Sequence, residues 1–191
     1  RNGKYGFIDS NAVLIIPVKY EQAGHFDHHG ISCVASGNKW GTINTAGDLV
    51  TPMIYDKIQL FHHGYANVFL NGKVGLIDST GREIIPCNYG GVSFFSEGLV
   101  GVRSGEKVGF ADLNGNIVIP CIYDWAGNFR EGRAAVRKNK SYGFINREGV
   151  EVIPLRYSYA ESFANGKARV NIQGNWFEID PNGNRLSEPE K

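Results

Sequence analysis

The feature of this sequence that most limits its fold is a repeat of about 34 residues, which runs through nearly the whole chain of 191 residues. Five kinds of position recur in phase. They are a glycine (Gly6, Gly41, Gly75, Gly109, Gly143), a proline (Pro17, Pro52, Pro86, Pro120, Pro154), a tyrosine three residues later (Tyr20, Tyr55, Tyr89, Tyr123, Tyr157), a phenylalanine (Phe26, Phe61, Phe95, Phe129, Phe163) and a second glycine (Gly30, Gly64, Gly98, Gly132, Gly166). A chain built this way folds as an array of similar units.

The first recurring glycine lies inside a predicted strand. In residues 74–78 the side chains of Val74 and Leu76 face one way and those of Gly75 and Ile77 the other, as in a β-strand. A glycine costs strand stability, so its recurrence predicts that a neighbouring backbone or an aromatic ring lies close over its Cα.

A tight turn follows this strand in each copy. In residues 78–81, Asp78 can accept hydrogen bonds from backbone amides and Gly81 can supply a positive φ. The pattern predicts a hairpin. Its return strand, residues 83–85 in this copy, should end at Pro86 because proline has no N–H for the ladder.

The rest of each copy predicts a third strand. The segment between the tyrosine and the phenylalanine fits either a turn or a single helical turn. After the second glycine the chain alternates again, as at Val100 and Val102, and Asn71-Gly72 predicts a two-residue hairpin to the first strand of the next copy. Neighbouring copies should therefore share sheets and bury their apolar faces on each other.

Together these patterns predict an all-β tandem array of hairpins with about sixteen short strands, three in each copy; the many glycines and aromatic residues agree with this class. An open superhelix, or solenoid, is favoured over a closed propeller-like ring, because a period of about 34 residues is short for a four-stranded blade. A single array over residues 1–183 is expected, with copies at about 3–36, 37–70, 71–104, 105–138 and 139–172, a partial sixth at 173–183, and a polar tail at 184–191.

The strand motifs also resemble a known family. Lys4-Tyr5-Gly6-Phe7-Ile8-Asp9, Lys39-Trp40-Gly41-Thr42-Ile43-Asn44 and Tyr142-Gly143-Phe144-Ile145-Asn146 are each followed by a turn glycine, a short apolar stretch ending in proline, and a tyrosine. Over about residues 3–183 they resemble the WG (or KWG) β-repeat family of bacterial proteins. The tryptophan of that name precedes the glycine only at Trp40, and Trp176 is followed by Phe177. The resemblance implies an accessory or interaction domain with no catalytic residues to carry over.

Charge and hydropathy narrow the class of partner. The formal net charge is +1, which gives no reason to expect nucleic acid or an anionic membrane surface as a partner. No apolar stretch approaches the roughly 20 residues that span a bilayer.

The fourth copy is locally basic. Arg130, Arg133 and Arg137 are therefore candidates for an anion-binding face, and an ordinary solvated face is the alternative. The chain opens inside the pattern, at Asn2-Gly3, so a fragment or a processed protein is expected; no compartment is indicated.

Histidines distinguish the first two copies from the others. The pairs His28-His29 and His62-His63 occupy the same position of adjacent copies. If those copies stack, four imidazoles could converge, and imidazole is a ligand for zinc, nickel or copper. Adjacent residues on a loop usually point apart, however, so we expect no metal and no other cofactor, and the four histidines remain candidate binding residues.

Trp125 and two cysteines also depart from the repeat. Lys57, Gly91 and Tyr159 hold the position of Trp125 in other copies, so Trp125 is a candidate contact residue for a protein or a sugar, or it packs against a neighbouring copy. Cys87 and Cys121 share the position after the proline; either a disulfide or a small buried apolar role fits them.

No pairing of nucleophile and base emerges from the sequence, and the recurring acids are explained as turn residues. We therefore do not expect an enzyme. The sequence predicts a binding scaffold whose partner is another protein. The alternative is an array that binds a glycan or small ligand through surface aromatics, such as Tyr65 and Trp125, in equivalent exposed grooves.

Overall fold

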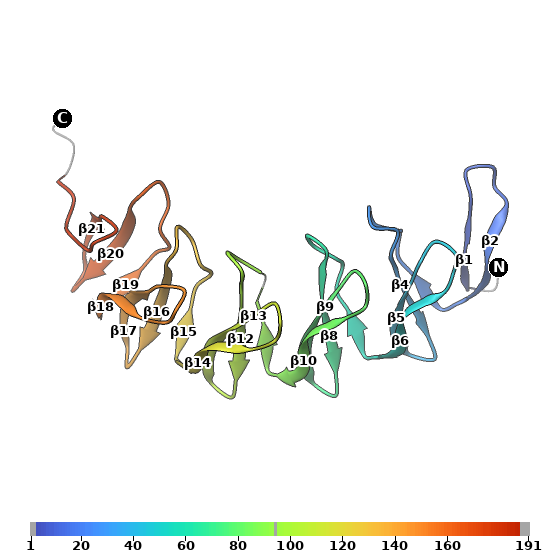
Figure 1. Ribbon diagram of the computed structural model, residues 1–191, viewed down its shortest axis with the longest axis horizontal. Helices are drawn as coiled ribbons and strands as arrows, with labels where there is room; N and C mark the ends of the chain where they lie inside the picture. The colour runs from blue at the N-terminus through green and yellow to red at the C-terminus, as the bar shows by residue number, and fades with distance from the viewer. Residues whose placement is uncertain (1–2, 94, 188–191) are drawn as a thin grey trace. The chain divides into compact units, whose positions relative to one another are not determined.

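A computed structural model describes residues 3–93 and 95–187, and over these ranges the chain forms β-strands and no helix. The all-β prediction is confirmed. The chain divides into two compact units, Arg1–Tyr89 and Gly90–Lys191, and each contains three small antiparallel sheets (Figure 1).

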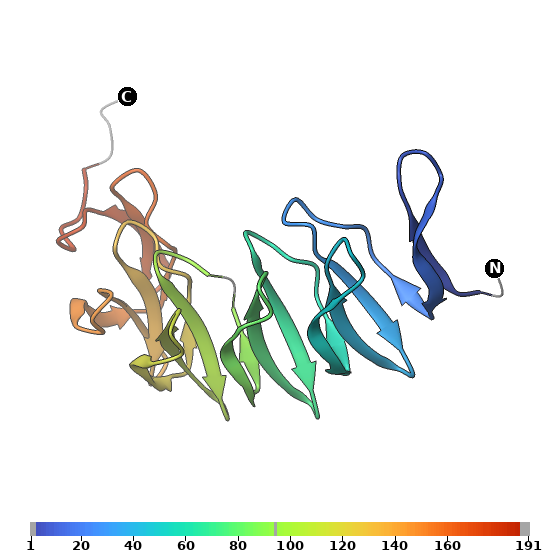
Figure 2. The ribbon, with the colours of Figure 1, turned by 45° about the vertical axis from the view of Figure 1, so that its right-hand side comes forward.

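The first unit holds ten of the described strands, which follow one another as hairpins (Figure 2). Their sheet orders are β1-β2, β3-β4-β5-β6 and β10-β9-β8-β7. The bounds are β1 Tyr5–Ile8, β2 Leu14–Tyr20, β3 Gln22–Ala23, β4 Ser32–Ser36, β5 Lys39–Ile43, β6 Leu49–Tyr55, β7 Lys57–Ile58, β8 Tyr65–Leu70, β9 Lys73–Asp78 and β10 Glu83–Tyr89.

The second unit repeats the same arrangement. Its sheet orders are β11-β12-β13-β14, β15-β16-β17-β18 and β19-β20-β21. The bounds are β11 Gly91–Val92, β12 Leu99–Ser104, β13 Lys107–Asp112, β14 Ile117–Tyr123, β15 Trp125–Ala126, β16 Ala134–Lys138, β17 Ser141–Ile145, β18 Glu151–Tyr157, β19 Tyr159–Ala160, β20 Ala168–Ile172 and β21 Asn175–Ile179.

The prediction of three strands per copy is wrong by one short strand. Within the described ranges, every sheet except β1-β2 begins with a strand of two residues: β3, β7, β11, β15 or β19. This strand occupies the segment that the sequence left open between a turn and a helical turn. It is extended because it pairs with the next strand, as Ala126 does with Val136.

The predicted sharing of sheets between copies is confirmed. Strands β8 and β9 belong to one sheet and pair from Tyr65↔Asp78 to Leu70↔Lys73. The two residues between them, Asn71 and Gly72, have φ of 52° and 72°, as a tight hairpin with two left-handed residues requires.

The return strands do not end at the proline, so this prediction is wrong. Strand β10 continues through Pro86, and β14 continues through Pro120. The ladder of β10 with β9 shifts register between Ile85 and Tyr89. This β-bulge takes the proline out of the ladder, where its missing N–H does no harm.

The same bulge explains the strand glycine. A Cβ on Gly109 would lie 2.3 Å from the carbonyl oxygen of Ile119, and one on Gly75 would lie 2.6 Å from that of Ile85. The sequence predicts that either a neighbouring backbone or an aromatic ring lies over this glycine. The structure shows that it is the backbone. Phe177 can occupy this position in the last sheet because the described sheet order ends at β21, with no fourth strand opposite it.

The predicted turns form between the third and fourth strands. Asp78 Oδ1 accepts hydrogen bonds from the backbone N–H groups of Thr80 at 2.9 Å and Arg82 at 3.1 Å, and Gly81 has a φ of 83°. Asp9, Asn44, Asp112, Asn146 and Asp180 accept backbone bonds in the same way. The turn is thus held by side chain to backbone bonds.

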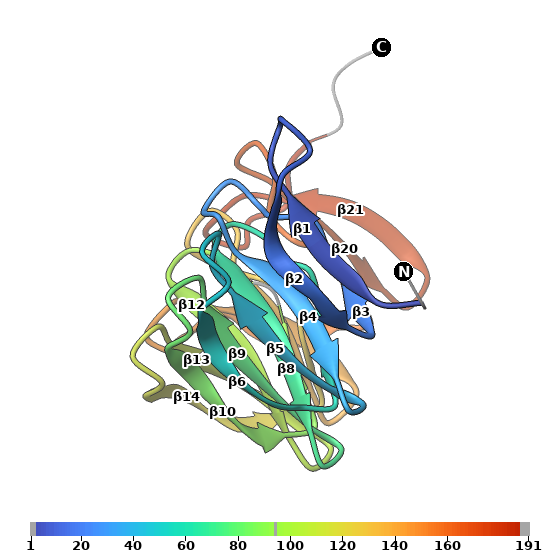
Figure 3. The same ribbon diagram turned by 90° about the vertical axis from the view of Figure 1, so that its right-hand side faces the viewer.

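Each unit buries its core between consecutive sheets. In the first unit, strand β2 lies beside the sheet of β4 and β5 (Figure 3). Ile16 and Tyr20 of β2 pack with Val34 of β4 and Ile43 of β5. In the second unit, Phe129 and Phe163, each 1% exposed, set their rings 4.9 Å from Phe110 and Phe144 of the preceding sheet. The expected burial of apolar faces on neighbours is confirmed. Phe95, which is 39% exposed, departs from this pattern.

Candidate functional site

One line of residues crosses every described sheet except β1-β2, from its first to its third strand in chain order. In the fourth copy Trp125 of β15 pairs with Arg137 of β16, which pairs with Tyr142 of β17. Directly opposed residues on neighbouring strands share a face of the sheet. The corresponding lines are Gln22-Ala35-Trp40, Lys57-Phe69-Val74, Gly91-Arg103-Val108 and Tyr159-Asn171-Trp176. These positions differ from copy to copy, whereas the core positions recur.

In the second unit, four of these positions form what we call the aromatic row: Trp125, Tyr142, Tyr159 and Trp176. Successive ring centroids are 5.8, 5.2 and 5.7 Å apart, and the successive rings are inclined by 55°, 45° and 62°. Trp125, Tyr159 and Trp176 are 36%, 45% and 42% exposed, and Tyr142 is half-buried. The row is therefore a continuous, ridged apolar strip that crosses two neighbouring sheets.

Two arginines lie against the aromatic row. The Arg137 Cζ is 5.9 Å from the centroid of Tyr142, and the Arg169 Cζ is 4.7 Å from that of Trp176, both within the range of cation–π attraction. Neither guanidinium forms a salt bridge within residues 3–93 and 95–187. The Arg137 Nε is moreover buried without a hydrogen-bond partner in the same ranges. Asp124 feels the charge of Arg137, and Glu178 pairs opposite Arg169, but these carboxylates form salt bridges with Lys107 and Lys167. Positive side chains therefore outnumber the carboxylates beside the strip.

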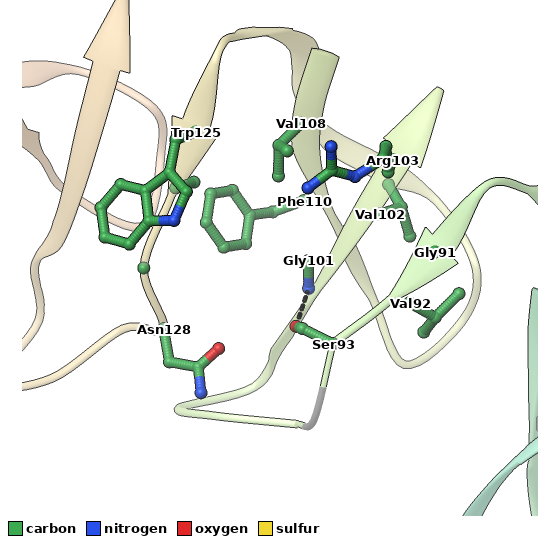
Figure 4. A pocket seen from close by; sticks show the side chains of 12 residues that line it. Gly91, Val92, Ser93, Gly101, Val102, Arg103, Val108, Phe110, Trp125 and Asn128 are labelled. Carbon is green, nitrogen blue, oxygen red and sulfur yellow. Dashed lines mark hydrogen bonds between the residues drawn. The ribbon is translucent and has the colours of Figure 1, made fainter. Parts of the chain in front are cut away.

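A small hollow adjoins the row at Trp125 (Figure 4). It has a volume of about 250 Å³, and Trp125, Phe110, Gly101 and Ser93 are among the residues that line it. The Ser93 Oγ accepts a hydrogen bond of 2.8 Å from the Gly101 N–H. Gly91 and Gly101 also line it, and a Cβ on Gly101 would lie 2.8 Å from the Ser93 Oγ. Small-molecule sites usually enclose about 300–1,000 Å³, so the hollow suits a side chain better than a whole ligand.

The basic residues of the fourth copy lie in different surroundings. Arg137 joins the aromatic row, whereas the Arg133 Cζ lies 5.4 Å from the ring centroid of Phe163. Arg130 is exposed in the turn before β16, where its backbone N–H donates to the Arg133 carbonyl oxygen. Of the sequence candidates, Trp125 thus belongs to the row and Arg137 lies against it.

Sequence reasoning missed Tyr142, Tyr159, Trp176 and Arg169 as site residues. A signal was available, since Tyr159 holds the position of Trp125 and Trp176 that of Tyr142 one copy later. Recognising the row required the cross-strand register that places both positions on one face.

The four candidate histidines lie on exposed loops of the first unit. The ring centroids of His28 and His29 are 3.9 Å apart, and those of His62 and His63 are 4.3 Å apart. A Cβ on Gly64 would lie 3.6 Å from the His29 Nε2, so His29 reaches the loop of the next copy. In the part of the chain that the structure describes, no group of three or more His, Cys, Asp and Glu is placed to hold a metal ion.

The position of His29 has a structural counterpart in later copies. There the carboxylate Oε2 of Glu97 accepts a 2.9 Å bond from the Gly132 N–H, and that of Glu131 accepts one from the Gly166 N–H. These bonds tie the loop of one copy to that of the next. The side chain at this position therefore links neighbouring loops.

The titratable groups with altered pKa serve the fold. Burial raises the pKa of the Cys33 thiol to about 11, and burial also raises the pKa of Cys87. The side-chain hydrogen bond from Lys107 lowers the pKa of Asp124, and that from Asn116 lowers the pKa of Asp112. The cysteines are free, and the Sγ atoms of Cys87 and Cys121 lie near the carbonyl oxygens of Val68 and Val102 within their own sheets.

Similar solved structures share little sequence with this chain. The Hsv2 structure of Kluyveromyces lactis with a complete loop 6CD has a TM-score of 0.48 at 10% identity, covering 83% of this chain and 58% of that one. A crystal structure of the eukaryotic initiation factor has a TM-score of 0.48 at 10% identity, covering 97% of this chain and 60% of that one. The chain thus spans less than two thirds of the length of either structure.

No curated protein matches this chain. Over the described residues, no helix is long and apolar enough to cross a membrane.

The repeat itself has a clear match. The sequence profile named WG containing repeat matches five consecutive segments, residues 5–40, 40–73, 75–107, 109–141 and 142–176. These segments contain the bulge-facing glycines and all the turns described above except that of Asp180, and together they cover most of the 191 residues. The chain therefore belongs to the WG containing repeat family.

Proposed function

We propose that this chain is a non-catalytic module that binds another protein, and that the aromatic row of the second unit is its binding surface. The observation that carries the proposal is the row itself. Its exposed tryptophans and tyrosines, with Arg137 and Arg169 beside them, are the residue types that dominate binding energy at protein interfaces. They lie at positions that the fold leaves free to vary.

Glycan or small-ligand binding is the second candidate, and the exposed aromatic side chains of the row favour it. Two observations favour the protein partner instead. Tyr65 is half-buried at the start of β8 and does not share the repeat position of Trp125, so the two do not offer equivalent grooves. The rings of the row are also inclined to one another, which gives ridges in place of a flat stacking platform.

We also propose that the sheets follow one another in an open array, as in a solenoid, and do not close into a ring. The support is the repeat period of about 34 residues, which leaves only two residues for the first strand of each sheet. An open array leaves the row accessible along its length to an extended partner.

The protein-binding proposal is tested by capture from a lysate of the source organism, with the chain as bait. The test variant combines Trp125→Gln with Tyr159→Gln, because Gln22 shows that the fold accepts glutamine at this position. The matched control is Gln22→Ala at the same position of the first unit. We expect specific partners to be lost from the double variant and retained by the control. Equal capture by both would refute the assignment of binding to the row.

A further inference from the structure

Resting on the proposed function, we propose that the row binds an extended, proline-rich peptide segment that carries acidic side chains. Three properties of the row support this chemistry: the spacing and inclination of its rings, the few free ladder positions on the outer strands beside it, and the neighbouring arginines, which form no salt bridge.

The spacing of the rings suits a polyproline II segment. The centroid distances of 5.8, 5.2 and 5.7 Å leave alternate rings no more than about 11 Å apart, and one turn of a polyproline II helix advances about 9 Å. Because successive rings are inclined by 45–62°, they leave notches between them. Proline rings can fill such notches at low entropic cost, since the segment is already extended.

The strands beside the row do not favour recognition by strand addition. Strand β15 is the outer strand of its sheet and β19 of the next, and each has only two residues. Strand β21, the other outer strand, has five residues, but Arg185 and Leu186 already pair with part of its edge, at Ile179 and Glu178. A peptide strand added there would gain few ladder hydrogen bonds. Its binding energy must therefore come from side-chain contacts with the aromatic row.

Charge complementarity favours acidic side chains on that segment. Arg137 and Arg169 form no salt bridge among the described residues. The carboxylates beside them, Asp124 and Glu178, are bound by Lys107 and Lys167. Arg103 lines the adjoining hollow and has no described salt bridge either. A glutamate or aspartate of the partner would accept charge-assisted hydrogen bonds from the exposed side chains of Arg103 and Arg169.

Single-stranded nucleic acid also combines stacking groups with negative charge, but the geometry favours the peptide. Base stacking needs free ring faces, and the guanidinium groups of Arg137 and Arg169 lie over the rings of Tyr142 and Trp176. The formal net charge of +1 supplies little attraction for a polyanion. Oligothymidylate is therefore a competitor to be tested.

The test is a titration with defined probes, followed by intrinsic tryptophan fluorescence. Two of the three tryptophans, Trp125 and Trp176, belong to the row, so binding there should change the signal. The probes are a peptide repeating Pro-Pro-Glu, the same peptide with lysine for glutamate, and the same peptide with alanine for proline. We expect saturable binding of the first, at least ten-fold weaker binding of the other two, and weakening by added salt.

Variants then locate the site. Arg137→Ala and Tyr159→Gln, for which Ala35 and Gln22 are natural precedents in the first unit, should each weaken binding of the acidic peptide at least ten-fold. Gln22→Ala should change it less than two-fold. Circular dichroism of each variant checks that the fold is kept.

Failure of this inference can be told apart from failure of the proposed function. If row variants lose partners from the lysate but no proline-rich acidic peptide binds, protein binding stands and the proposed peptide chemistry is wrong. Equal binding of the lysine peptide would overturn the charge argument. Tighter binding of oligothymidylate or of a cello-oligosaccharide, lost in Tyr159→Gln, would overturn the peptide proposal in favour of that ligand.

Discussion

At the scale of single residues, the glycine of each motif is required by space and not by backbone angle. At Gly109 a Cβ would meet the Ile119 carbonyl oxygen at 2.3 Å, and no left-handed φ is involved. The bulge that accommodates Pro120 pushes this carbonyl inward. The glycine and the proline of each repeat therefore depend on the same β-bulge.

This arrangement predicts the effect of Gly109→Ala. The added methyl group must displace backbone, which should cost about 1–3 kcal/mol, as overpacking does. The urea midpoint of unfolding measures the change. Gly91→Ala is the control, because a Cβ there has its closest neighbour, the Arg103 Cβ, at 3.8 Å and an ordinary φ. Equal midpoints for both variants would contradict the steric explanation.

At the scale of elements, the turns carry acids whose ionisation contributes to folding. The side-chain bond from Asn116, together with backbone N–H groups, lowers the pKa of Asp112 below its ordinary value of 3.8. Because the pKa is lower in the folded state, this stabilisation is fully present above 3.8 and is lost as the pH falls through the folded value. Asp180 is affected in the same way.

Asp112→Asn tests this contribution. Asn44 and Asn146 occupy the same position and accept the same turn bonds, so the variant should keep the turn while removing the titrating group. We expect a lower urea midpoint than that of the natural chain at pH 6. The difference should shrink as the pH falls below 3.8. A difference independent of pH would mean that ionisation of Asp112 does not contribute.

The elements also show why some features could be predicted and others could not. Turns such as residues 78–82 depend on contacts between near neighbours, so the sequence predicts them directly. The two-residue strands and the aromatic row depend on pairing between residues distant in the chain, as between Trp125 and Arg137. Propensity carries no information about that register, and the bulge at Pro86 was missed for the same reason.

At the scale of the whole molecule, the open-array proposal makes a prediction for scattering in solution. A compact domain of this length has a radius of gyration of about 16 Å. An open array of thin sheets should exceed that value clearly in small-angle X-ray scattering. A radius near the compact value, with a nearly spherical distance distribution, would instead favour a closed ring.

The variable line across each sheet has a consequence for how such a molecule can change. Alanine, phenylalanine and arginine occupy its middle position in the four-stranded sheets, at Ala35, Phe69, Arg103 and Arg137, while the bulge and turn beside it stay the same. The last sheet has asparagine there, at Asn171. Mutation can therefore alter recognition in one copy without endangering the scaffold. Duplication of a copy would add a surface segment that is free to diverge. New binding specificities could then arise by adding copies and substituting residues in this line.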